Sequence, residues 1–148
     1  MQKIIFFFFI FFFLVENSHG EEEYFLTLRN DKVNLRQGPS FDYPIKIIYK
    51  KKFLPVLVQD SSDNFRKIRD HENNSGWVHV SQLAKKKAAI VIEGDLIMFR
   101  SATIYSNPVV LLEEGRLVKI DKCKVDWCKV RSGGFKGWIK NESLWGLF

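Results

Sequence analysis

Short runs of alternating apolar and polar residues fill most of the chain and predict β-strands. The stretches VNLR (33–36) and PVLVQ (55–59) are typical, and clusters of Gly, Asp, Asn, Ser and Pro separate one run from the next. No long stretch carries apolar residues at helical spacing. The predicted fold class is therefore all-β.

The order of these runs occurs twice along the chain. Residues 33–45 align with residues 97–109, and residues 55–83 align with residues 117–144. The offset between the copies falls from 64 (33 to 97) to 61 (83 to 144), and these changes fall in the predicted loops, where insertions are tolerated. The alignment predicts two copies of one small domain, and the matched positions include Phe65 with Trp127, Gly76 with Gly137, Trp77 with Trp138 and Arg36 with Arg100.

The motifs of the first copy resemble those of the bacterial SH3-like (SH3b) family. They are VNLRQGPS, then YPI, LPVLV and NFRKI, and finally GWV and a closing SQL. The resemblance covers residues 28–84 well and residues 93–148 more weakly, because FRSAT (99–103) replaces LRQGP (35–39) in the second copy. It implies two tandem, strongly bent antiparallel β-barrels of about five or six strands each. Residues 85–92 are expected to form the linker between them.

The N-terminus predicts export. Lys3 precedes the apolar run IIFFFFIFFFLV (4–15), and Ser18 and Gly20 are the small residues expected at a signal-peptidase site. The run has 12 residues, fewer than the roughly 20 that cross a bilayer as a helix. Residues 1–20 are therefore predicted to be a cleaved signal peptide rather than an anchor. The remaining chain is expected to be periplasmic or secreted, without a membrane span.

The two cysteines predict a structural disulfide. Cys123 and Cys128 supply only two of the four ligands of a structural zinc, and they lack the Cys-x-x-Cys spacing of redox motifs. A two-residue turn at Val125-Asp126 places them opposite each other in a hairpin, provided that a β-bulge lies near Asp121–Lys122. An exported compartment oxidises such a pair.

Candidate chemistry elsewhere is sparse. No Ser-His-carboxylate trio and no His-Glu metal motif occurs, so neither an enzyme, a metal nor a cofactor is predicted. The net charge of +6, with lysines clustered at 50–52 and 85–87, suits an anionic wall polymer, a membrane surface or an acidic protein in an exported chain, and nucleic acid is not an expected partner. Surface lysines also serve solubility alone.

Aromatic residues beside the predicted loops are the candidate ligand contacts. The resemblance implies binding of a peptide or a wall component by an aromatic-lined groove, and the first copy is favoured because it keeps the Gly38-Pro39 turn. The expected partner is an envelope protein or a peptidoglycan peptide. A structural or assembly protein and a regulatory subunit of a wall hydrolase are the alternatives. The predicted ligand-binding residues are Phe41, Tyr43, Phe65 and Trp77, with Tyr105 and Trp127 as further candidates and a scaffold role as the alternative for Trp77.

Overall fold

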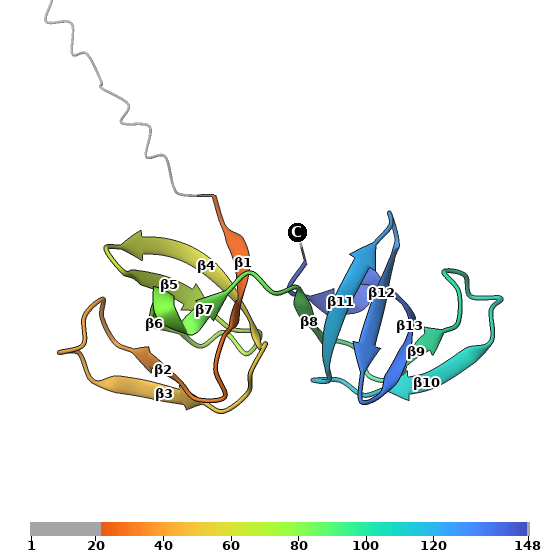
Figure 1. Ribbon diagram of the computed structural model, residues 1–148, viewed down its shortest axis with the longest axis horizontal. Helices are drawn as coiled ribbons and strands as arrows, with labels where there is room; N and C mark the ends of the chain where they lie inside the picture. Colours follow the sequence, from red (N-terminus) through yellow and green to blue (C-terminus); the bar gives the residue numbers. More distant parts are fainter. Residues whose placement is uncertain (1–21, 148) are drawn as a thin grey trace, which may run out of the picture.

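The computed structural model describes residues 22–147 and places them in two seven-stranded antiparallel sheets (Figure 1). The predicted all-β class is thereby confirmed. The predicted signal peptide and its cleavage site lie outside the described residues. Within the part of the chain that the structure describes, no helix is long and apolar enough to cross a membrane.

The first sheet has the strand order β3-β2-β6-β5-β4-β1-β7. The chain enters through β1, forms the β2–β3 hairpin and then the β4–β5–β6 meander, and returns beside β1 after one short 3-10 turn, η1. Its elements are β1 (Tyr24–Leu28), β2 (Val33–Arg36), β3 (Ile45–Tyr49), β4 (Pro55–Ser62), β5 (Phe65–Arg69), β6 (Ser75–His79), η1 (Val80–Gln82) and β7 (Leu83–Ala84).

The second sheet repeats this topology with the order β10-β9-β13-β12-β11-β8-β14. Seven strands form where five or six were expected, because β7 and β14 have only two residues each and leave no sequence pattern. Its elements are β8 (Ala88–Val91), β9 (Leu96–Phe99), β10 (Pro108–Leu112), β11 (Leu117–Cys123), β12 (Trp127–Ser132), β13 (Phe135–Lys140), η2 (Asn141–Ser143) and β14 (Leu144–Trp145).

Both sheets bend at equivalent places. The β4–β5 register shifts between Val58 and Asp60, and the β11–β12 register shifts between Ile120 and Lys122. Such bulges bend and twist a strand, so each sheet curls on itself. One paired position joins the hairpin to the meander in each sheet: Arg36 with Trp77 in the first, and Phe99 with Trp138 in the second.

The two copies have separate cores that touch. The first is built on inward-facing residues such as Leu35 and Ile68, and the second on residues such as Val130 and Ile139. Ile90 of β8 packs with the core of the first copy, so the barrels dock on each other.

The segment between the sheets is shorter than the sequence suggested. Residues 88–91, expected in the linker at 85–92, form β8, and all four are buried. Four small or apolar residues in a row fit a strand that is covered on both faces. The connection between the two sheets is thereby reduced to Lys85–Lys87.

Candidate functional site

The loop after β2 closes over the first barrel through an aromatic cluster. The Phe41 ring lies 5.2 Å from the Phe65 ring and 5.1 Å from the His79 ring, measured between centroids. Arg36 donates hydrogen bonds to the carbonyl oxygens of Phe41 (3.2 Å) and Tyr43 (2.9 Å). These contacts hold the loop against the start of β5 and the end of β6, and Phe65 is only 6% exposed beneath it.

The four predicted ligand-binding residues of the first copy do not all meet. Phe41 and Phe65 are in contact, and Phe41 keeps a large exposed surface. Tyr43 lies against Gly38, where an added Cβ would come within 2.5 Å of the ring. Trp77 is half-buried on β6, in register with Arg36 of β2 and Lys67 of β5.

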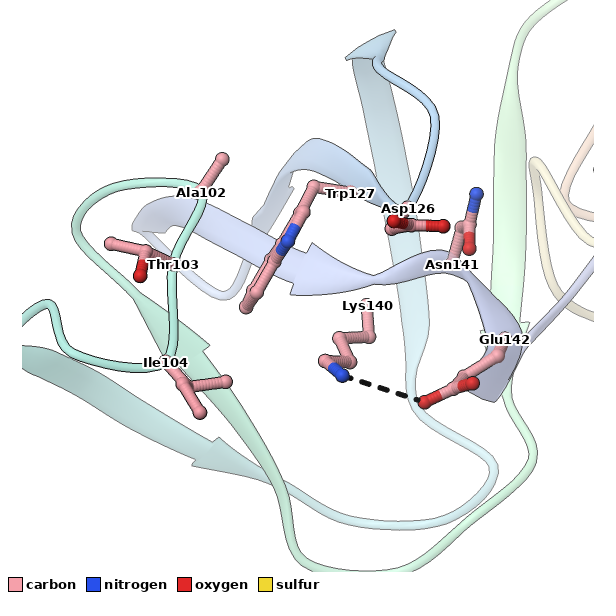
Figure 2. Close-up of a pocket in the computed structure, with 8 residues that line it drawn as sticks. All are labelled: Ala102, Thr103, Ile104, Asp126, Trp127, Lys140, Asn141 and Glu142. Carbon is pink, nitrogen blue, oxygen red and sulfur yellow. Dashed lines mark ion pairs between the residues drawn. The ribbon is translucent and has the colours of Figure 1, made fainter.

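The second copy has an open cavity at the equivalent place. It has a volume of about 470 Å³ and lies between the loop after β9, the β11–β12 turn and the junction of β13 with η2 (Figure 2). Figure 2 shows the Trp127 ring between the loop residues and the Lys140 side chain. The lining residues are Ala102, Thr103, Ile104, Asp126, Trp127, Lys140, Asn141 and Glu142.

The cavity is open because the second loop leaves its aromatic residue outside. Tyr105 aligns with Phe41 but is 92% exposed, so it does not cover Trp127. The loop bonds to itself, as the first loop also does: the Thr103 N–H donates to the Ser101 carbonyl (2.8 Å), and the Ser101 N–H donates to the Ser106 hydroxyl (2.9 Å). Trp127 therefore rests on Phe99, in an edge-to-face contact with 5.8 Å between centroids, and stays half-buried.

The cavity combines an aromatic face with accessible charges of both signs. The Lys140 ammonium lies 6.0 Å from the centre of the Trp127 ring and 3.9 Å from a carboxylate oxygen of Glu142. The Lys140 and Glu142 side chains are 45% and 72% exposed, so water screens the pair and both charges remain available to a ligand. His79 and Ser81 occupy the corresponding positions in the first copy, which lacks this charge pair.

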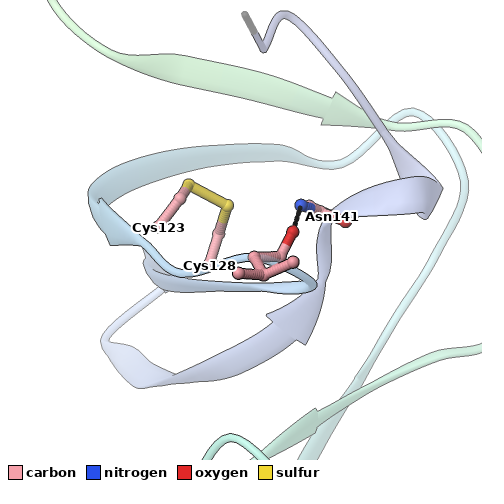
Figure 3. The surroundings of a disulfide bond; sticks show 4 residues. Cys123, Cys128 and Asn141 are labelled. Carbon is pink, nitrogen blue, oxygen red and sulfur yellow. Dashed lines mark hydrogen bonds between the residues drawn. A yellow bond between two sulfur atoms is a disulfide. The ribbon is translucent and has the colours of Figure 1, made fainter.

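The predicted disulfide is confirmed and supports one wall of the cavity (Figure 3). It joins Cys123 to Cys128 across the β11–β12 hairpin, with 4.0 Å between their Cα atoms, and the predicted bulge before Cys123 is present. The Asn141 amide donates to the Val125 carbonyl (2.8 Å), which ties the tip of this hairpin to η2. Since Trp127 is next to Cys128 in sequence, the cross-link helps to fix the aromatic wall.

Removal of the disulfide is expected to lower the free energy of unfolding by about 2 kcal/mol, because a short loop restricts the unfolded chain only modestly. The variant is Cys123→Ala with Cys128→Ala, since alanine leaves no hydroxyl in the apolar surroundings of Cys128. Urea unfolding of the oxidised protein, the reduced protein and the variant measures the difference. Equal midpoints for all three would contradict the expectation.

Sequence reasoning named Trp127 among its candidates but missed Lys140 and Glu142. The repeat aligns Lys140 with His79 and Glu142 with Ser81, so the sequence alone shows that the residue types at these two positions differ between the copies. The sequence does not show which of the two loops leaves a cavity, because that depends on where the side chains of Phe41 and Tyr105 point. Among residues 22–147, no group of three or more His, Cys, Asp or Glu side chains is arranged to hold a metal.

Comparison with solved structures finds distant similarity. NlpC2 and NlpC1 from Trichomonas vaginalis are 11% and 13% identical to this chain, each with a TM-score of 0.38. The matches cover 84% and 86% of this chain and 48% and 47% of those chains, so the chain spans about half the length of these structures. No curated protein matches the chain in sequence.

The chain also matches a sequence family, and it does so twice. The family described as "Bacterial SH3 domain" matches residues 29–85 and again residues 95–146. These regions hold 57 and 52 residues, together 109 of 148, and each falls on one of the two sheets. The repeat, the shared strand order and the two matches agree, and the chain belongs to the bacterial SH3 domain family, with two tandem copies.

Proposed function

We propose that this protein is an exported, non-catalytic binding module that holds a short extended peptide of the cell wall in the cavity beside Trp127. Bacterial SH3 domains are commonly cell-wall binding modules. The observation that carries the proposal is the open cavity of the second copy, which combines an aromatic face with an accessible cation and carboxylate.

The chemistry of the lining favours a peptide that carries both a free amino group and a carboxylate. Trp127 offers apolar contact area at a low cost in side-chain entropy. Lys140 is placed to pair with a ligand carboxylate, and Glu142 or Asp126 with a ligand ammonium group. Aromatic-lined grooves that receive extended peptides are a recurring mode of recognition, and the position between a loop and a 3-10 turn suits an extended chain.

The proposed location and the absence of catalysis have their own support. The disulfide is consistent with an oxidising, extracytoplasmic compartment, and the predicted signal peptide agrees with it. No histidine or cysteine lines the cavity, so its lining lacks the Ser–His and Cys–His pairs of nucleophilic catalysis.

We place a second, shallower contact on the first copy. Phe41 and Tyr43 are 64% and 47% exposed there, and Phe65 supports the Phe41 ring from beneath. The proposed surface also includes Trp77, which is half-buried. This contact adds area rather than charge selectivity, because no ion pair corresponding to Lys140–Glu142 is present among the described residues of this copy.

Calorimetric titration of the purified protein with soluble peptide fragments of the cell wall tests the proposal. Trp127→Ala is expected to weaken binding by about tenfold or more, since aromatic anchors commonly contribute more than 1 kcal/mol. Tyr105→Ala is the matched control, because this aromatic side chain of the same copy points into solvent. Tyr43→Ala is expected to weaken binding by about threefold at most.

The alternatives give different results in the same titration. Equal losses for Trp127→Ala and Tyr105→Ala, or binding abolished by Tyr43→Ala alone, would remove the Trp127 cavity as the site. Absence of binding to any wall fragment would overturn the proposed function. Circular dichroism of each variant confirms that the fold is kept before the affinities are compared.

A further inference from the structure

A basic groove runs along β1 and the segment that joins the two barrels. It consists of two adjoining hollows of about 650 and 700 Å³, which share Tyr24, Leu26, Lys85 and Lys86 in their lining. One hollow lies between β1 of the first copy and β11 of the second, and the other continues over β1 and β7. In Figure 1, the connection passes beside β1 on its way to β8. We call this feature the lysine groove.

The lysine groove is lined by cations without opposing acids. Neither hollow has an Asp or Glu in its lining, and none of its cations belongs to the three ion pairs found among residues 22–147. Two of them bond only to neutral groups: Arg29 donates to the Leu83 carbonyl, and Arg66 donates to the carbonyls of Asp63 and Phe65. The six cations are Arg29, Arg66, Lys85, Lys86, Lys87 and Lys122.

Two carboxylates that neighbour the groove in sequence have partners outside its lining. Glu23, which precedes β1, accepts a hydrogen bond from the Gln59 side chain (2.9 Å). Asp121 lies beside Lys122 in sequence but pairs with Arg131 (2.9 Å) and Lys136 (3.5 Å). Because the lining itself carries six cations and no acid, it has a net positive charge, which concentrates anions.

We propose that the lysine groove binds a linear, phosphodiester-linked anionic polymer of the cell envelope. Its concave shape, between two barrels, suits a single flexible chain better than a flat bilayer. Lysine ammonium groups are mobile point charges, so they suit evenly repeated phosphates better than one ligand of fixed geometry. The apolar walls, which include Tyr24 and Leu26, leave room for the uncharged parts of such a chain.

This site is separate from the Trp127 cavity. The two share no lining residue. The β11–β12 hairpin stands between them, because Asp126 and Trp127 line one site and Lys122 and Cys123 line the other. A wall peptide and an anionic polymer can therefore occupy the protein together, which would anchor it on two components of one envelope.

Binding of linear poly(glycerol phosphate) to the purified protein tests the proposal. The charge-neutral variant Lys85→Gln with Lys86→Gln is expected to weaken binding by about tenfold at low salt and to lower the slope of log Kd against log salt by about one per lysine. The matched control is Lys50→Gln with Lys51→Gln. It removes the same charge from exposed lysines outside the groove and is expected to change the affinity less than about twofold.

Every other outcome points away from the lysine groove. Equal weakening by both double variants would show that net charge alone attracts the polymer. Tighter binding of polyglutamate, or binding of phosphatidylglycerol vesicles with the same dependence on Lys85 and Lys86, would replace the polymer by an acidic protein or a membrane. Trp127→Ala should leave polymer binding unchanged, so failure of the peptide site and failure of this one are distinguishable.

Discussion

Replacement of Asp70 by alanine is expected to lower the free energy of unfolding by about 3 kcal/mol or more, because four donors lose a buried acceptor. Asp70 is 1% exposed. Its carboxylate accepts from the Tyr49 hydroxyl (2.8 Å) and the Asn74 side chain (2.9 Å), and from the backbone N–H groups of Glu72 (2.9 Å) and Asn74 (2.8 Å). Burial, together with the hydrogen bond to Asp70, raises the pKa of Tyr49, so its hydroxyl remains a donor.

Urea unfolding monitored by tryptophan fluorescence measures this loss. Asp31→Ala is the control, because Asp31 is exposed in a turn and exposed substitutions usually change stability by less than about 0.5 kcal/mol. Asp70→Asn should fall between the two, since an amide keeps one acceptor oxygen but not the charge. An Asp70→Ala midpoint equal to that of Asp31→Ala would show that the β5–β6 turn is held by other contacts.

The second large effect is expected at Gly137, where β13 passes close to β9. A Cβ built there would lie 2.6 Å from the Phe99 carbonyl oxygen and 2.5 Å from Met98 Cγ. Backbone cannot yield as a flexible side chain does, so Gly137→Ala should push β13 away from β9 at a cost of about 2–3 kcal/mol. Because β13 ends at Lys140, peptide binding in the Trp127 cavity should weaken as well.

Two other glycines serve as a replicate and as a control for this experiment. Gly76→Ala in the first copy should cost about as much, because its Cβ would lie 2.6 Å from the Arg36 carbonyl oxygen. Gly94→Ala should be neutral or slightly stabilising, since nothing lies within 4 Å of the added methyl group. A loss for Gly94→Ala as large as that for Gly137→Ala would mean that the close approach of the strands does not explain the effect.

Local sequence patterns determined much of the fold. Alternation of apolar and polar residues determined the all-β class, because the side-chain period of a strand is visible over a few residues. The duplicated motifs determined the two barrels. The spacing of Cys123 and Cys128 determined the disulfide and even the bulge beside it, since the register of a hairpin follows from its turn.

Other features were decided only by contacts between segments far apart in the sequence. In the first copy, Phe41 folds back onto β5 and β6. Its counterpart in the second copy, Tyr105, turns outward and leaves a cavity. The lysine groove likewise exists only because the docked barrels bring β11 alongside β1 and Lys85–Lys87. Strand periodicity records which side of a sheet a residue faces, but not which distant surface meets it, so the candidate sites emerged from the packing of the two copies.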